Sequence, residues 1–246
     1  MEKWRLLSLR SSDPYLNMAI EEAVLIAVNE GKSPSTVRFW RNARSVVLGR
    51  SQNIAEEVNI RECEKHGVRV VRRFTGGGAV YQDFNNLNWT FVISRHSKLF
   101  PENFSQLYRL TCMAVIEGLK DLCVNAEFKQ PNSIWIKNKK VSGLAAYIKR
   151  NAALCHGTLL VNTDINILSK VLSSPRYQVT NIRNELKDNV SISMFTIERA
   201  ILRGFQNLYK IQVKPKGLSE YESSISRSLY EEKYRENFWN FKGMYL

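Results

Sequence analysis

The sequence lacks the long hydrophobic segments of a membrane protein. No apolar run in its 246 residues approaches the length that spans a bilayer. The N-terminal residues 1–5 also lack the apolar stretch of a signal peptide. These absences argue against a transmembrane or secreted protein and predict a cytoplasmic one.

Metal-binding side chains are scarce. The chain has 4 cysteines, without C-x-x-C spacing, and 3 histidines, which together give no zinc pattern. We therefore expect no structural metal, and we expect most cysteines to be small buried apolar residues.

Acidic residues are outnumbered, 23 against 36 lysines and arginines, which gives a formal charge of +13. Such an excess favours anionic substrates, an acidic protein partner or nucleic acid. The basic residues are spread along the chain and no nucleic-acid motif accompanies them, so we expect no nucleic-acid partner. A non-catalytic basic module that binds nucleic acid or protein stays open as an alternative.

The apolar pattern predicts one α+β domain over residues 1–246, with the option of a small C-terminal subregion from about residue 187. Strands come in runs joined by hairpins and do not alternate regularly with helices. Helices are expected at 17–29, 54–66, 102–122, 164–173, 196–209 (with Thr196 as N-cap) and 219–234. Strands are expected at 36–40, 45–48, 68–73, 79–81, 88–94, 133–137, 140–147, 153–161 and 211–213.

The most informative stretch is residues 72–81, Arg-Arg-Phe-Thr-Gly-Gly-Gly-Ala-Val-Tyr. Glycine tolerates positive φ and lets backbone N–H groups approach a ligand closely. Arg73 beside Gly76, Gly77 and Gly78 favours a site for a carboxylate or phosphate. A flexible turn with an arginine in a surface salt bridge is the alternative.

A lysine at residue 140 follows a predicted hairpin turn and precedes small residues. Ser142, Gly143 and Ala145 would let a bulky ligand lie on this strand. Lys140 could then neutralise charge that develops on an α-phosphate. Without such a ligand it would be an ordinary exposed turn lysine.

Three blocks, in order, resemble the lipoate–protein ligase A family. Residues 72–89 resemble its signature loop, 139–143 its lysine loop and 156–162 its His-Gly-Thr strand. The resemblance runs from about Leu9 to the end and is closest to the short archaeal form. It implies a biotin/lipoate ligase-like catalytic domain, with a mixed, largely antiparallel sheet flanked by helices.

The resemblance implies an ATP-dependent, AMP-forming ligase. Lipoate and Mg²⁺-bound ATP would give lipoyl-AMP, and the lipoyl group would pass to a lysine of an acceptor. The implied acceptors are the E2 lipoyl domain of 2-oxoacid dehydrogenases and the glycine cleavage H protein. The longer ligases of the family carry an accessory C-terminal domain that we expect to be absent here, so a separate accessory subunit is expected.

The resemblance also assigns roles to residues. Lys140 would be the catalytic lysine, with Lys139 as the candidate if the loop register differs by one. The implied lipoate- and ATP-binding residues are Trp40, Arg73, Thr75, Gly76, Gly77, Gly78, Ala79, Gln82, Asn86, Asn132, Gly143 and His156.

The sequence departs from the family pattern at three positions. Gln82 stands where the family usually has histidine, and glutamine can donate a hydrogen bond but cannot carry a proton. Asn85 replaces a usual glycine. Ser133 replaces an aspartate that helps to place Mg²⁺, so the metal ligands are left unassigned.

Cys155 defines a rival function. A cysteine beside a histidine could be the nucleophile of an ATP-independent octanoyl or lipoyl transferase. Adjacent residues of a strand point to opposite faces, however. If His156 faces the pocket, Cys155 is expected to face away from it.

Overall fold

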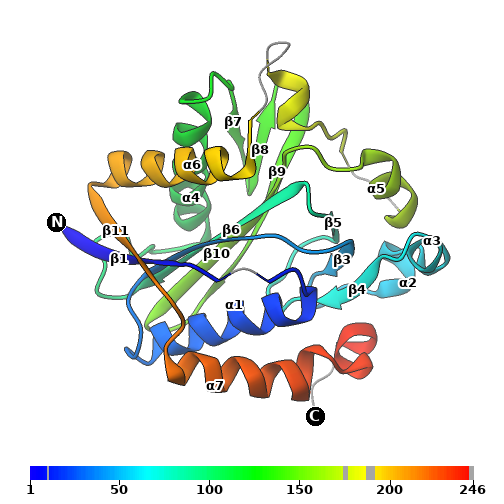
Figure 1. The fold of residues 1–246 in the computed structure, drawn as a ribbon, viewed down its shortest axis with the longest axis horizontal. Helices are drawn as coiled ribbons and strands as arrows, with labels where there is room; N and C mark the ends of the chain where they lie inside the picture. Colours follow the sequence, from blue (N-terminus) through cyan, green and yellow to red (C-terminus); the bar gives the residue numbers. More distant parts are fainter. Residues whose placement is uncertain (10, 174–176, 187–191, 244–246) are drawn as a thin grey trace.

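A computed structural model describes residues 1–9, 11–173, 177–186 and 192–243 (Figure 1). Its larger sheet has eight strands in the order β11-β1-β2-β6-β10-β9-β8-β7, and its smaller sheet has three in the order β4-β3-β5. Neighbouring strands are antiparallel except for the parallel pairs β1/β2, β1/β11 and β3/β4. The predicted mixed, largely antiparallel sheet with flanking helices is confirmed.

The strands of the larger sheet are β1 (Glu2–Leu7), β2 (Thr36–Trp40), β6 (Asn86–Ser94), β7 (Glu127–Lys129), β8 (Ser133–Ile136), β9 (Lys139–Ile148), β10 (Ala152–Leu160) and β11 (Ile211–Lys216). Those of the smaller sheet are β3 (Ser45–Leu48), β4 (Arg69–Arg72) and β5 (Val80–Gln82). The helices are α1 (Pro14–Asn29), α2 (Ile54–Glu57), α3 (Ile60–Lys65), α4 (Phe104–Lys120), α5 (Ile165–Val171), α6 (Met194–Tyr209) and α7 (Glu220–Leu229), with short helical turns η1 (Ile182–Glu185), η2 (Tyr230–Tyr234) and η3 (Phe238–Lys242).

Helices cover both faces of the larger sheet (Figure 1). The pair α4 and α6 covers one face, over a core that contains Trp89, Phe91 and Phe205. The pair α1 and α7 covers the other, over a core that contains Met18 and Leu154. Because side chains alternate along a strand, β6 and β10 contribute to both cores.

The N-terminal cap of α1 explains where that helix begins. The Asp13 carboxylate accepts hydrogen bonds from the backbone N–H of Tyr15 and Leu16, and Pro14 occupies the first turn. The sequence predicted the helix to start only at residue 17.

The expected helix over residues 54–66 is wrong, because two short helices replace it. Val58 is extended between α2 and α3, where it forms a bridge with Leu172 next to α5. Asn59 then caps α3 by accepting from the N–H of Glu62. Tertiary pairing with Leu172 thus interrupts a locally helical sequence.

Other local expectations also need correction. Ser193, not Thr196, caps α6, because the Ser193 hydroxyl accepts from the Thr196 N–H. Strands β1 and β7 were not anticipated, and β1 pairs in parallel with β2 and with β11 near the far end of the chain. Residues 187–191, where a C-terminal subregion was predicted to begin, lie outside the described residues.

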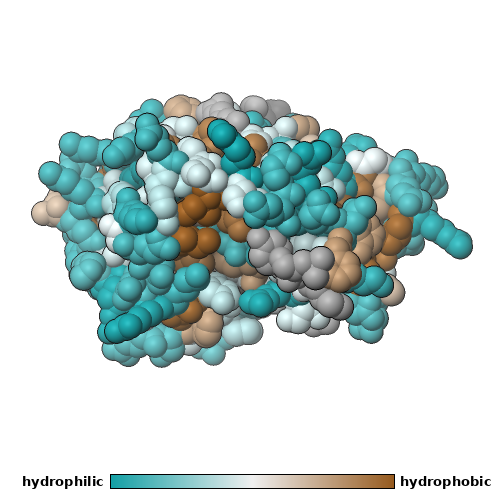
Figure 2. Space-filling model, turned by 90° about the horizontal axis from the view of Figure 1, so that it is seen from below, coloured by the Kyte–Doolittle hydropathy of each residue, from teal (hydrophilic) through white to brown (hydrophobic). Residues whose placement is uncertain are grey.

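The surface seen from below Figure 1 is mainly hydrophilic, with small hydrophobic patches (Figure 2). Among the described residues, no helix has the length and hydrophobicity to cross a membrane.

Close packing of α4 on α6 gives a stability prediction. A Cβ on Gly204 would lie 2.5 Å from the backbone nitrogen of Gly118, so Gly204→Ala forces the two helices apart. We expect a loss of roughly 1–3 kcal/mol or more in the free energy of unfolding, measured by urea denaturation. Gly217→Ala is the control, because a Cβ there meets nothing within 4 Å. Equal stability of the two variants would contradict this packing.

Candidate functional site

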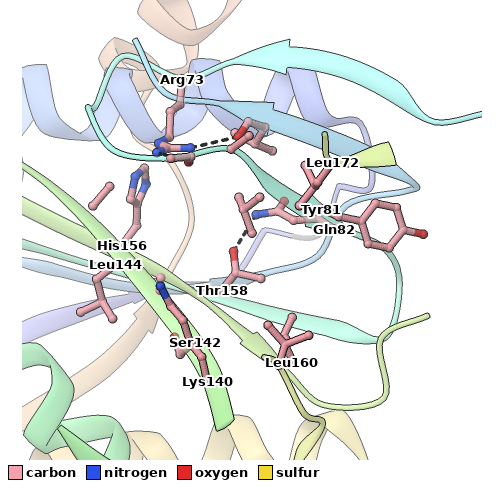
Figure 3. Close-up of a pocket in the computed structure, with 18 of the residues that line it drawn as sticks. Arg73, Tyr81, Gln82, Lys140, Ser142, Leu144, His156, Thr158, Leu160 and Leu172 are labelled. Atoms are coloured by element: carbon pink, nitrogen blue, oxygen red, sulfur yellow. Dashed lines mark hydrogen bonds between the residues drawn. The ribbon is translucent and has the colours of Figure 1, made fainter. Parts of the chain in front are cut away.

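A cavity of about 380 Å³ lies between the two sheets (Figure 3). Strands β9 and β10 form one wall, and the segment from the glycine loop into β5 forms another. Of the 13 residues singled out from the sequence, nine line the cavity: Trp40, Arg73, Gly78, Ala79, Gln82, Asn132, Lys140, Gly143 and His156. Thr75, Gly76, Gly77 and Asn86 are not among the lining residues.

The Arg73 guanidinium holds the glycine loop. Its Nη2 donates to the carbonyls of Gly76 and Gly78 at 2.6 and 2.9 Å, and its Nη1 donates to the Val47 carbonyl at 3.0 Å. Arg73 is buried, and in the described part of the chain no carboxylate forms a salt bridge with it. Burial lowers its pKa to about 10. The result is a desolvated positive charge at the cavity wall.

Two glycines are required by the shape of this loop. Gly77 has a φ of +90°, which side-chain-bearing residues rarely adopt. A Cβ on Gly49 would lie 1.9 Å from the Gly77 carbonyl oxygen, so only glycine fits there. The loop therefore packs backbone on backbone beside Arg73.

Lys140 extends from β9 toward the cavity on the side opposite Arg73 (Figure 3). Its ammonium lies 4.8 Å from the centre of the Tyr177 ring, and burial lowers its pKa. A Cβ on Gly143 would come within 3.1 Å of the Lys140 Cε, so the glycine leaves room for this side chain. Lys139 is exposed and does not line the cavity.

Gln82 is held from several sides. Its amide nitrogen donates to the Thr158 hydroxyl at 2.7 Å, and its carbonyl oxygen accepts from the amides of Asn42 and Asn88 at 2.8 and 3.3 Å. Gln82 thus donates a hydrogen bond, as expected of a glutamine at this position. Its donation is directed at Thr158 on the cavity wall.

Asn86 serves the turn before β6. Its side-chain oxygen accepts from the Asp83 N–H at 2.8 Å, and its amide lies against the Tyr81 carbonyl. A contact between Asn86 and a ligand stays a prediction. Asn132 lines the cavity while its amide donates to the Leu144 carbonyl at 2.7 Å.

The Ser133 hydroxyl is engaged in two hydrogen bonds within the protein. Its hydroxyl donates to the Lys129 carbonyl at 3.0 Å and accepts from the Trp135 indole at 2.8 Å. Among the described residues, no group of three or more His, Cys, Asp or Glu side chains could hold a metal ion.

His156 and Cys155 point to opposite faces of β10, as expected. His156 lines the cavity, and its Nε2 lies 2.8 Å from the Thr75 hydroxyl. Cys155 belongs to the core under α4, where it accepts a hydrogen bond from Thr111, and burial raises its pKa to about 12. None of the four cysteines lines the cavity.

Several functional-site residues were missed by sequence reasoning. Apolar side chains from α1, β10 and the region of α5 line part of the cavity. A buried carboxylate, Glu21, contacts the lining residue His156 and pairs with Arg38. The sequence signal for a buried polar wall was the alternation of Asn86, Asn88 and Thr90 in β6. That signal was ambiguous, because a strand with one face toward solvent has the same alternation. The missed lining residues of the apolar part are Met18, Leu160, Leu168 and Leu172.

Comparisons with known proteins all point to the same protein family. The model of the lipoyl protein ligase A/B catalytic domain matches residues 13–206. A probable lipoate-protein ligase A of Mycoplasma genitalium is 32% identical over 245 residues, which cover 95% of this chain and 70% of that protein. Lipoate-protein ligase A subunit 1 of Thermoplasma acidophilum is 31% identical, covering 96% of this chain and 95% of that protein. Octanoyltransferase LipM of Halalkalibacterium halodurans is 28% identical, covering 98% and 100%.

Solved structures agree. A structure of a bi-partite lipoate protein ligase and its E2 lipoyl domain from T. acidophilum has a TM-score of 0.90 and 31% identity, covering 100% of this chain and 99% of that one. A lipoate-protein ligase A bound with ATP has a TM-score of 0.90 and 32% identity, covering 99% and 100%. A T. acidophilum ligase with bound lipoic acid has a TM-score of 0.86 and 32% identity, covering 98% and 100%. With most of its length matched by the family model, this chain belongs to the lipoyl protein ligase A/B catalytic domain family.

Proposed function

We propose that this chain is a lipoate–protein ligase that forms lipoyl-AMP from lipoate and ATP and passes the lipoyl group to a protein lysine. The observation that carries the proposal is the placement of Arg73 and Lys140 on opposite sides of one cavity. Two desolvated cations there suit the carboxylate of the acyl group and the α-phosphate of ATP.

The shape and lining of the cavity support an acyl substrate. Its volume of about 380 Å³ is in the range of small-molecule sites. Met18, Trp40, Val47 and Leu168 supply an apolar surface for the lipoyl chain. Similar proteins are described with bound lipoic acid and with bound ATP, which are the two substrates of the proposed adenylation step.

Chemistry at this site needs charge stabilisation and exclusion of water. During adenylation a lipoate carboxylate oxygen attacks the α-phosphorus and pyrophosphate leaves, so negative charge builds on the α-phosphate oxygens. The Lys140 ammonium is placed to stabilise that charge. The acceptor lysine amine then attacks the acyl carbon, and AMP leaves as the amide forms.

Mg²⁺ enters this scheme with the nucleotide. Mg²⁺ is commonly held by one or two carboxylates together with substrate phosphates. With Ser133 engaged by backbone and indole groups, we propose that the ATP phosphates supply most of the metal's ligands. The ion would neutralise phosphate charge, and Arg73 and Lys140 would act beside it.

The proposed partners are lipoyl-acceptor proteins and a second ligase subunit, in the cytoplasm. The acceptors are the E2 lipoyl domain and the glycine cleavage H protein. Similarity to subunit 1 of the T. acidophilum ligase, and to a bi-partite ligase described with its E2 lipoyl domain, supports this arrangement.

The rival is an octanoyltransferase, because LipM is among the similar proteins. A nucleophilic cysteine must reach the acyl group as a thiolate. Cys155 lies under α4 with its pKa raised by burial to about 12, and no other cysteine lines the cavity. These observations favour the ligase.

Replacing the cavity lysine tests the ligase mechanism. We predict that Lys140→Ala lowers lipoate- and ATP-dependent pyrophosphate release about a hundredfold or more, because charge on the α-phosphate loses its stabilisation. Exposed Lys139→Ala is the matched control and should be mild. Near-normal turnover of Lys140→Ala at saturating ATP and lipoate would remove Lys140 from the mechanism.

Replacing the cysteine separates ligase from transferase. Cys155→Ser should retain ligase activity, because a serine hydroxyl can still accept the hydrogen bond from Thr111. Intact-mass measurement after incubation with an octanoyl donor should find no acyl adduct on the wild type. An adduct that disappears in Cys155→Ser would instead establish the transferase.

Dependence on a second subunit has its own test. We predict that the purified chain alone releases pyrophosphate slowly from lipoate and ATP, and that its cognate second subunit raises the rate. Transfer from preformed lipoyl-AMP to an E2 lipoyl domain should proceed without that subunit. Full ATP-dependent lipoylation by the chain alone, unchanged by the second subunit, would refute the two-subunit proposal.

A further inference from the structure

A buried carboxylate behind the cavity wall has no assigned role. Glu21, on α1, is 1% exposed and is not among the lining residues. Its Oε1 accepts from Arg38 Nη1 at 2.8 Å, and its Oε2 accepts from the Thr90 hydroxyl at 2.5 Å. His156 Nδ1 lies 3.4 Å from the same Oε2. Arg38, Thr90 and His156 form one cross-strand row over β2, β6 and β10, and Glu21 lies against all three.

From this row the contacts continue to the cavity. The Trp40 indole donates to the Thr90 hydroxyl at 3.1 Å. His156 Nε2 lies 2.8 Å from Thr75 Oγ1, and that oxygen accepts from Arg73 Nε at 3.0 Å. Glu21 thus contacts His156 directly, and it is connected to Trp40 through Thr90 and to Arg73 through His156 and Thr75.

The chemistry of these groups sets the direction of each hydrogen bond. An ionised carboxylate only accepts, so the His156 Nδ1 that faces Glu21 Oε2 carries a proton. In a neutral ring Nε2 is then an acceptor, so the Thr75 hydroxyl donates its hydrogen to Nε2 while its oxygen accepts from Arg73 Nε. Burial lowers the pKa of His156 although Glu21 opposes the shift, which agrees with a neutral ring.

We propose that Glu21 is a positioning residue: by holding His156 as the Nδ1–H tautomer, it orients the Thr75 hydroxyl and, through it, the Arg73 guanidinium. Glu21 touches no ligand itself. The structural part of this inference is independent of the reaction, and only its kinetic consequence rests on the proposed ligase function.

Glu21→Gln reverses the key hydrogen bond. With its carbonyl oxygen toward Arg38, the new side chain turns an NH₂ group toward Thr90 and His156. An NH₂ group cannot accept the Nδ1 proton, so the ring is expected to shift to the Nε2–H tautomer. Thr75 then loses the acceptor for its hydroxyl hydrogen.

Nitrogen-15 NMR of the imidazole rings reads the tautomer directly, without substrate. The chain has only 3 histidines, His66, His96 and His156, so His156→Gln assigns the signal. We expect Nδ1–H in the wild type and Nε2–H or a mixture in Glu21→Gln. Glu22→Gln is the matched control, because the Glu22 carboxylate accepts from Lys233 and Tyr234 instead, and it should leave the His156 signals unchanged.

A wild-type ring protonated on Nε2, or an unchanged tautomer in Glu21→Gln, overturns the inference. If loss of the charge opposite Arg38 prevents Glu21→Gln from folding, Glu21→Asp keeps the charge and draws it back from His156. That variant should show a mixture of the two His156 tautomers. An unchanged tautomer in Glu21→Asp would likewise overturn the inference.

A double-mutant cycle tests the connection to Arg73. Thr75→Val removes the hydroxyl and leaves the Glu21–Arg38 pair intact. We expect it to lower kcat roughly tenfold to a hundredfold, as small misplacements of a reacting group do, with KM for lipoate within about threefold. Glu21→Asp should lower kcat in the wild type and have little further effect in Thr75→Val. Additive effects would contradict transmission through Thr75.

The two proposals fail differently. Absence of lipoate- and ATP-dependent pyrophosphate release by the wild type, with Mg²⁺ and the second subunit present, refutes the proposed function. The tautomer measurement then decides the inference about Glu21 on its own.

Discussion

The cavity depends on the hydrogen bonds that the Arg73 guanidinium makes to the glycine loop. The side chain binds carbonyl oxygens of Gly76 and Gly78 from its own loop and of Val47 from β3, so one cation fixes both the loop and its distance from the smaller sheet. Placing a charge in this position costs desolvation energy, and the described carboxylates do not offset it. A bound carboxylate or phosphate would offset this cost, so the group that shapes the glycine loop would also contribute to ligand affinity.

The rest of the site extends this arrangement across the larger sheet. Strands β2, β6 and β10 carry apolar side chains on the face toward α4, and on the face toward α1 they carry polar side chains such as Arg38, Thr90 and His156 beside apolar ones such as Leu154. These polar side chains are buried and many pair with one another: Gln82 with Thr158 and Asn42, and Glu21 with Arg38. Paired buried polar groups favour the one geometry that keeps their hydrogen bonds, because an unpaired buried polar group is costly. These hydrogen bonds therefore fix the positions of Gln82, Thr158 and His156 at the cavity wall.

The sequence predicts the regions where local signals agree with tertiary structure. The strands over residues 36–40 and 45–48 have the bounds that the sequence predicted. Nine of the 13 site residues singled out from the sequence line the cavity. Prediction from the sequence fails where contacts between residues far apart in the chain determine the local structure. Val58 is extended because it pairs with Leu172, and β1 exists because β2 and β11 flank it. Glu21 gave no signal, since a glutamate on an amphipathic helix is ordinarily a solvent-facing residue.

The alternation of side chains along β10 places Cys155 and His156 of this chain on opposite faces of the sheet. Shifting that strand by one residue would place Cys155 in the cavity and His156 under α4, because side chains alternate faces. The register is fixed on both sides: Gly157 lies against the Trp89 ring, where a Cβ would come within 2.4 Å, and His156 pairs with Thr90 and Ala145 of the neighbouring strands. A slip would bury an imidazole among Phe91 and Val115 and remove the contact between His156 and Glu21. The packing that excludes the thiol from the cavity is thus the same packing that keeps the histidine in it.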